Sequence, residues 1–191
     1  MDNISLHQFS VNRWTKATFW GWVIGIALIL IISSFLDSIH IEHTQFYLGV
    51  GVGAGVGFTQ WRLLRKFIPI PSTWLWFSIV GMGIPFVLLD LIPSEVLTHK
   101  LPVSITLGSL TVGFLQYTIL RKHSLKAKQW IAGSFLGWVL GVLTVFIIDY
   151  TNNLKSVVSS NLVLAAINLF LMLAGGIVLG IITGKILNKI I

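Results

Sequence analysis

The chain has 191 residues, of which 55% are hydrophobic and only 10% charged, and its mean hydropathy is +0.88. Soluble domains carry about 25% charged residues, so this composition excludes an ordinary soluble enzyme and indicates a membrane protein. The absence of cysteine excludes disulfides, thiol catalysis and cysteine metal sites.

Residues 1–18 precede the first long apolar stretch. We expect a cytoplasmic N-terminal segment there, either a short interfacial helix or a segment without fixed structure. Residues 19–191 then form one membrane domain with six apolar stretches, each close to the length of about 20 residues that crosses a bilayer. These stretches are 19–35, 46–64, 74–91, 103–120, 130–148 and 162–182. The sequence therefore predicts an all-α polytopic membrane protein with six transmembrane helices.

The distribution of basic residues predicts the orientation. Eleven of the 13 Lys and Arg lie on the side that both termini share, and only Lys100 and Lys155 lie on the opposite side. Cytoplasmic loops carry the excess of Lys and Arg, so we expect a multi-pass protein of the cell (inner) membrane with both termini in the cytoplasm. The net charge of +7 is explained by this topology, and no nucleic-acid partner is expected.

The second stretch contains a glycine ladder, "GVGVGAGVG" at 49–57. A dinucleotide site would need a carboxylate about 20 residues further on, where this chain has "IPIPST". Small residues in a membrane helix instead let backbones approach closely, and Gly53 and Gly57 have the G-x-x-x-G spacing. The ladder thus predicts helix packing.

The even-numbered stretches end in a repeated motif. "VGFTQWRLLRK" (56–66) returns as "VGFLQYTILRK" (112–122), and "LGIITGKILNK" (179–189) is a weaker third copy with Thr183 at the Gln position. The repeat predicts three hairpins of the same topology, at about 19–66, 74–122 and 130–189. Such copies are related by an axis along the membrane normal, here a pseudo-threefold axis, and we expect the even helices near its centre.

With these two-span units, the chain resembles a group of uncharacterised bacterial multi-pass membrane proteins. These are built from repeated two-helix hairpins with a Gly-x-x-Gln-aromatic-x-x-Leu-Arg signature. The third copy departs from the signature because it lacks the Gln and the Arg. The resemblance implies a fold and no activity.

Two features are candidate parts of a ligand site. Gln60 and Gln116 lie a turn inside the cytoplasmic boundary and could contact a headgroup, although an interhelical hydrogen bond is the simpler interpretation. In "GMGIPF" (81–86), Pro85 crowds the carbonyl of Gly81, which predicts a kink that could expose backbone groups to a ligand.

Each odd-numbered stretch ends with an aspartate: Asp37, Asp90 and Asp149. Anions at a helix C-terminus oppose the macrodipole. One interpretation is a solvated turn residue, and the other is a structural latch in which each Asp accepts hydrogen bonds from the first turn of an even helix.

Anionic lipid headgroups are the expected partners of the basic residues at the cytoplasmic ends of the second and fourth helices. These residues are Arg62, Arg65, Lys66, Arg121 and Lys122. The histidines and acids of the outer loops have no metal-motif spacing, so neither a metal nor another cofactor is predicted.

No catalytic motif occurs, and no His or charged residue lies in the middle of a span, so we do not expect an enzyme. Two functions remain open. The protein binds or transports a lipid-like, pigment or other apolar small ligand, or it is a structural or assembly subunit that docks a membrane-protein partner.

Overall fold

The computed structural model describes residues 9–41, 44–93, 96–97, 99–152 and 161–191, without the side chains of 149–152. The described residues form six α-helices and one short 3₁₀ helix, with no strand among them. The helices are α1 (Val11–Ser38), α2 (Phe46–Leu64), α3 (Thr73–Asp90), α4 (Lys100–Leu120), η1 (Leu125–Lys128), α5 (Gln129–Asn152) and α6 (Asn161–Ile190). Five of the α-helices, all except α2, are long and apolar enough to cross a membrane. The all-α class is therefore confirmed, and five helices that are long and apolar enough to cross a membrane support a multi-pass membrane protein.

Helix α1 begins earlier than the apolar stretch indicated. It starts at Val11 rather than near residue 19, and Trp14 and Thr18 are fully buried against other helices. The segment 11–18 is thus the first part of α1 rather than a separate interfacial helix, because its apolar face has a partner in the bundle. The rest of the expected N-terminal segment, residues 1–8, lies outside the described residues.

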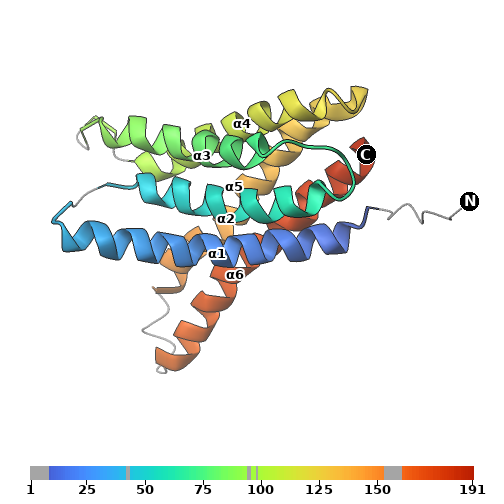
Figure 1. The fold of residues 1–191 in the computed structure, drawn as a ribbon. Helices are drawn as coiled ribbons and strands as arrows, with labels where there is room; N and C mark the ends of the chain where they lie inside the picture. Colours follow the sequence, from blue (N-terminus) through green and yellow to red (C-terminus); the bar gives the residue numbers. More distant parts are fainter. Residues whose placement is uncertain (1–8, 42–43, 94–95, 98, 153–160) are drawn as a thin grey trace, which may run out of the picture.

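The helices pack as a closed ring in chain order. Each packs mainly against the helices before and after it, and α6 returns to pack against α1. Figure 1 shows the start of α1 and the end of α6 at the same end of the bundle, which we call the terminal end; the opposite end is the distal end. The expectation that even helices occupy the centre is corrected, because all six helices line the axis of the ring.

The glycine ladder lets α2 pack closely on both neighbours. A Cβ atom at Gly53 would lie 2.5 Å from the carbonyl oxygen of Ser78 in α3. On the other face, a Cβ at Gly51 would lie 3.2 Å from the carbonyl oxygen of Gly25 in α1. Successive glycines of the ladder therefore pack alternately against α3 and α1. Helix α2, which contains these glycines, is also the one α-helix outside the five that are long and apolar enough to cross a membrane.

Glycines of the other even helices also face the odd helix that follows in the ring. A Cβ at Gly113 in α4 would lie 3.1 Å from the Ile131 carbonyl oxygen of α5. A Cβ at Gly180 in α6 would lie 2.7 Å from Thr15 Cα of α1. Close packing of small residues is therefore used at all three of these helix pairs.

Helix α3 continues through Pro85, which lies inside the span Thr73–Asp90 and is buried. The space around Gly81 is occupied by α4, since a Cβ there would lie 2.9 Å from Val112 Cγ2. The "GMGIPF" segment is accordingly a packed part of a continuous helix.

Candidate functional site: an apolar cavity above three closed layers

Three layers of side chains fill the terminal half of the ring, and each α-helix contributes one residue to each layer. The layer nearest the terminal end, the tryptophan layer, consists of Trp14, Leu64, Trp74, Leu120, Trp130 and Leu187. The ring centroid of Trp130 lies 6.1 Å from that of Trp14 and 5.5 Å from that of Trp74. Aromatic pairs at such distances each add about 0.5–1.5 kcal/mol beyond their area burial. This end of the ring is thus tightly packed.

The next turn of every helix supplies a buried polar residue. This polar layer consists of Thr18, Gln60, Ser78, Gln116, Ser134 and Thr183. Gln116 is its most connected member: its Nε2 donates to Ser78 Oγ at 2.9 Å, and its Oε1 accepts from Trp130 Nε1 at 2.9 Å. These bonds join α3, α4 and α5, so the amide acts as a bridge between three helices.

The remaining hydrogen bonds of the polar layer differ in length. Trp14 Nε1 donates to Thr183 Oγ1 at 2.9 Å, which joins α1 to α6. Gln60 Nε2 donates to Thr18 Oγ1 over a longer distance, 3.3 Å. Trp74 Nε1 is buried without a hydrogen-bond partner among the described residues. The polar layer is therefore better bonded around Gln116 than around Gln60.

A third, central layer follows one more turn towards the distal end. It consists of Trp22, Val56, Met82, Val112, Trp138 and Leu179. Two contacts hold Trp22 in place. Its Nε1 donates to the Met172 carbonyl at 2.9 Å, and its Cβ packs closely against Gly176, which has no side chain of its own. The central layer separates the polar layer from the distal half of the ring.

An apolar cavity of about 460 Å³ lies on the distal side of the central layer. Trp22, Met82 and Trp138 of the central layer contribute to its lining, and residues from all six α-helices complete its walls. The walls include Ile26, Val52, Phe86, Ile105, Val142 and Met172. Its volume falls in the range of about 300–1,000 Å³ that is typical of small-molecule sites. The cavity offers apolar side chains and almost no hydrogen-bonding groups, so it suits an apolar group.

A second cavity of about 300 Å³ adjoins it at the distal end. The two cavities share Leu101 and Phe146 in their walls. The second cavity is more polar, because Gln45, His99 and Lys100 line it. We call this second cavity the mouth.

The four residues predicted to contact a ligand do not line the apolar cavity. Gln60 and Gln116 lie in the polar layer, on the other side of the central layer. Gly81 and Pro85 are buried in α3, and the cavity is lined by Met82 and Phe86 from the same helix. The lining residues are ordinary apolar residues with no motif. Nothing in the sequence distinguishes them from the other apolar residues of the helices.

The three aspartates differ in their contacts. Asp90 Oδ2 accepts from the backbone N–H groups of Gln45 at 2.8 Å and of Phe46 at 2.9 Å, at the start of α2. This is the geometry that the latch hypothesis describes. Asp37 is exposed at the end of α1, and the side chain of Asp149 lies outside the described residues. No group of three or more metal-binding side chains occurs in the described part of the chain.

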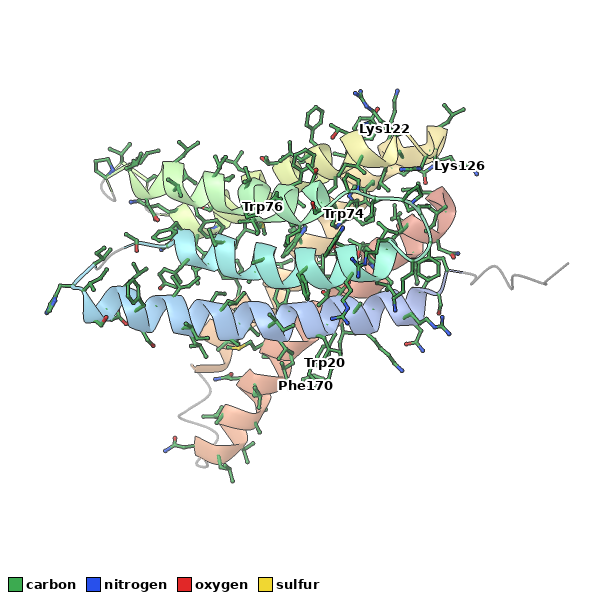
Figure 2. All side chains as sticks on the ribbon, viewed as in Figure 1. Trp20, Trp74, Trp76, Lys122, Lys126 and Phe170 are labelled. Atoms are coloured by element: carbon green, nitrogen blue, oxygen red, sulfur yellow. The ribbon has the colours of Figure 1, made fainter. Side chains whose placement is uncertain are left out.

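The basic residues named as headgroup ligands are exposed near the terminal end. These are Arg62, Arg65, Lys66, Arg121 and Lys122. Arg65 Cζ lies 4.7 Å from the ring centroid of Trp61, a cation–π contact that holds one guanidinium at the surface. Figure 2 shows Lys122 and Lys126 together at this end, whereas Trp20, Trp76 and Phe170, all at least 59% exposed, lie on the sides of the bundle. Cationic and apolar surfaces are thus separated along the bundle, as in a protein that crosses a bilayer.

Comparison with known proteins finds no matching family model, no matching curated protein and no matching solved structure. The functional interpretation therefore depends on the geometry of this chain.

Proposed function

We propose that all six α-helices cross the inner membrane with the terminal end in the cytoplasm, so that the cavity opens towards the outside. The eleven basic residues on the terminal side support this orientation. The position of α2 supports a sixth span, since it packs between α1 and α3, which are both long and apolar enough to cross a membrane. Anionic lipid headgroups would then contact the exposed Arg and Lys at the cytoplasmic surface.

The hairpins α1–α2, α3–α4 and α5–α6 are, in this proposal, three repeats around a pseudo-threefold axis. The layer residues support it, because the odd helices place Trp14, Trp74 and Trp130 in one layer, each four residues before a small hydroxyl residue of the polar layer. The even helices place Gln60, Gln116 and Thr183 in corresponding positions. Symmetry of this kind explains why every helix contributes once to each layer.

The function that the geometry supports best is binding of an apolar small molecule, without catalysis. The apolar cavity of about 460 Å³ carries this conclusion, because it is large enough for a ligand and is lined by all six helices. The closed layers below it would hold a ligand in the outer half of the membrane and block its passage through the ring.

Docking of a membrane-protein partner is the alternative, and one observation favours it. The first half of α6 leaves the other helices in Figure 1, and Leu162, Leu169 and Phe170 on it are exposed. However, exposed apolar side chains occur on all six helices, as contact with lipid requires, so this surface is not distinguished by its chemistry. The cavity is the more specific feature.

Bromine-induced quenching of tryptophan fluorescence tests the proposed binding, because Trp22 and Trp138 line the cavity. The purified protein in mild detergent is titrated with a dibrominated long-chain alcohol, and we expect saturable quenching at one probe per chain. The double variant Val142→Phe/Val145→Phe fills the cavity and should lose this component. Leu140→Phe/Leu143→Phe, on the exposed face of the same helix, is the matched control and should retain it. Quenching that is not saturable, or that both double variants retain equally, would refute the proposal.

A further inference from the structure

The mouth of the cavity differs in chemistry from its interior. Trp22, Met82 and Trp138 line the apolar cavity, whereas the polar residues Gln45, His99 and Lys100 line the mouth. Leu101 and Phe146 line both cavities, so the mouth and the apolar cavity are direct neighbours. A ligand that fills both must have an apolar part and a polar end.

The polar end of the site contains one lysine, Lys100. Lys100 is half-buried at the first position of α4 and forms no ion pair with another described residue. The side chain of the N-cap residue His99 makes no capping hydrogen bond, so no side-chain cap offsets the positive end of the α4 dipole. Lys100 is also the only Lys or Arg of the described residues on the distal side. Among the described residues, the basic side chain on the distal side is therefore confined to the mouth.

Gln45 provides a second, independent observation. Its Oε1 is buried in the mouth region and has no hydrogen-bond partner among the described residues. A primary amide both donates and accepts, so rotation of the side chain would present Nε2 to an anion. The backbone N–H of Gln45 is already bonded to Asp90, which fixes the residue at the start of α2. The carboxylate of Asp90 is therefore engaged with α2.

From these contacts we infer that the ligand is a single-chain anionic amphiphile of the long-chain carboxylate type. Its chain occupies the apolar cavity, and its carboxylate lies in the mouth and accepts hydrogen bonds from Lys100 and Gln45. A single chain matches a cavity of drug-like volume, whereas a lipid with two acyl chains needs about twice the space. The inference rests on the proposed function and adds the chemical class of the ligand.

The test compares two dibrominated probes of equal chain length, the fatty acid and the alcohol, in the same quenching titration. It uses the full-length protein in mild detergent at mildly alkaline pH, where the fatty acid is ionised. We expect the wild type to bind the carboxylate about fivefold more tightly than the alcohol, since a basic residue near a membrane surface contributes about that factor. Lys100→Gln should remove this preference and leave the affinity for the alcohol unchanged. Lys126→Gln, an exposed lysine at the opposite end of the bundle, is the matched control and should keep the preference.

The possible outcomes distinguish the inferred anionic headgroup from the proposed binding of an apolar molecule. Equal affinity for both probes in the wild type, or a preference that survives Lys100→Gln, overturns the anionic headgroup and leaves the apolar binding site intact. Failure of both probes to quench saturably refutes the binding function itself. Retained alcohol binding in Lys100→Gln also shows that the variant is folded.

Discussion

Replacement of Gln116 by leucine tests how much the polar layer stabilises the bundle. The side chain is 2% exposed and makes two hydrogen bonds of 2.9 Å, to Ser78 and from Trp130. Leucine is similar in size and removes both bonds. Ser78 keeps its bond to the Trp74 carbonyl, whereas the buried indole N–H of Trp130 loses its acceptor. An interhelical hydrogen bond in a membrane contributes about 0.6 kcal/mol, and a buried donor without a partner costs about 1–3 kcal/mol. The expected loss in the free energy of unfolding is therefore about 2–3 kcal/mol.

Gln60→Leu is the matched control, because Gln60 occupies the corresponding position in α2. Its amide makes a longer bond of 3.3 Å to Thr18, and Trp74 Nε1 does not donate to it. The leucine variant should therefore lose only about 0.5 kcal/mol. Both variants are unfolded reversibly in mixed micelles by titration with a denaturing detergent. Helicity is followed by circular dichroism, since tryptophan fluorescence would report the altered surroundings of Trp130 as well as unfolding.

The test is whether Gln116→Leu loses more free energy of unfolding than Gln60→Leu. A loss for Gln60→Leu equal to that for Gln116→Leu would mean that the two amides are equally bonded, against the geometry described above. Two losses below about 0.5 kcal/mol would mean that the polar layer contributes no more than an ordinary membrane hydrogen bond. Either result would refute the view that Gln116 is the main bridge between helices.

Three further predictions concern packing, the distal end and orientation. Gly57→Leu should lower the free energy of unfolding in detergent by about 1–3 kcal/mol, because even a Cβ atom would lie 2.5 Å from Ser78 Cβ. The variant should therefore melt at a lower temperature, and an unchanged melting temperature would contradict the close packing of α2 on α3. Asp90→Asn should lower the free energy of unfolding by about 1 kcal/mol through the loss of two charge-assisted hydrogen bonds, whereas the exposed Asp37→Asn should melt like the wild type. In the cysteine-free chain, an impermeant thiol reagent added outside cells should label Ser38→Cys and spare Ser124→Cys; labelling of the latter would reverse the proposed orientation.

The sequence predicted best those features that depend only on the length of an apolar stretch or on the spacing of small residues. Its predicted second span, 46–64, coincides with α2 at Phe46–Leu64, because Gln45 and the basic "RLLRK" end mark both boundaries. The G-x-x-x-G spacing of Gly53 and Gly57 correctly indicated a helix interface, with α3 as the neighbour. These features depend on local chemistry, which a single sequence contains.

The cavity could not be located in this way. Its position depends on where large side chains from six helices meet, and the sequence does not distinguish Trp22 and Trp138 from an exposed tryptophan such as Trp20. The start of α1 was missed for a related reason. Arg13 and Lys16 interrupt the apolar run, although Trp14 between them and Thr18 just after them face the bundle and are fully buried. Burial on one helical face is decided by tertiary contacts, and a hydropathy average does not detect it.

The arrangement of layers also bears on whether the protein binds its ligand or moves it across the membrane. A path to the terminal end would have to pass the central layer, the polar layer and the tryptophan layer in turn. Opening the last two would break the bonds from Trp14 to Thr183 and from Trp130 to Gln116, and would separate the edge-to-face indoles of Trp14 and Trp130. Each broken bond leaves a buried donor that costs about 1–3 kcal/mol, so two such bonds alone cost several RT. On the distal side, the described residues next to the cavity are those that line the mouth, and no layer of interlocked tryptophans like the one at the terminal end occurs among them. The cost of opening these layers therefore favours the proposed binding of a ligand from the distal side over its transport through the ring.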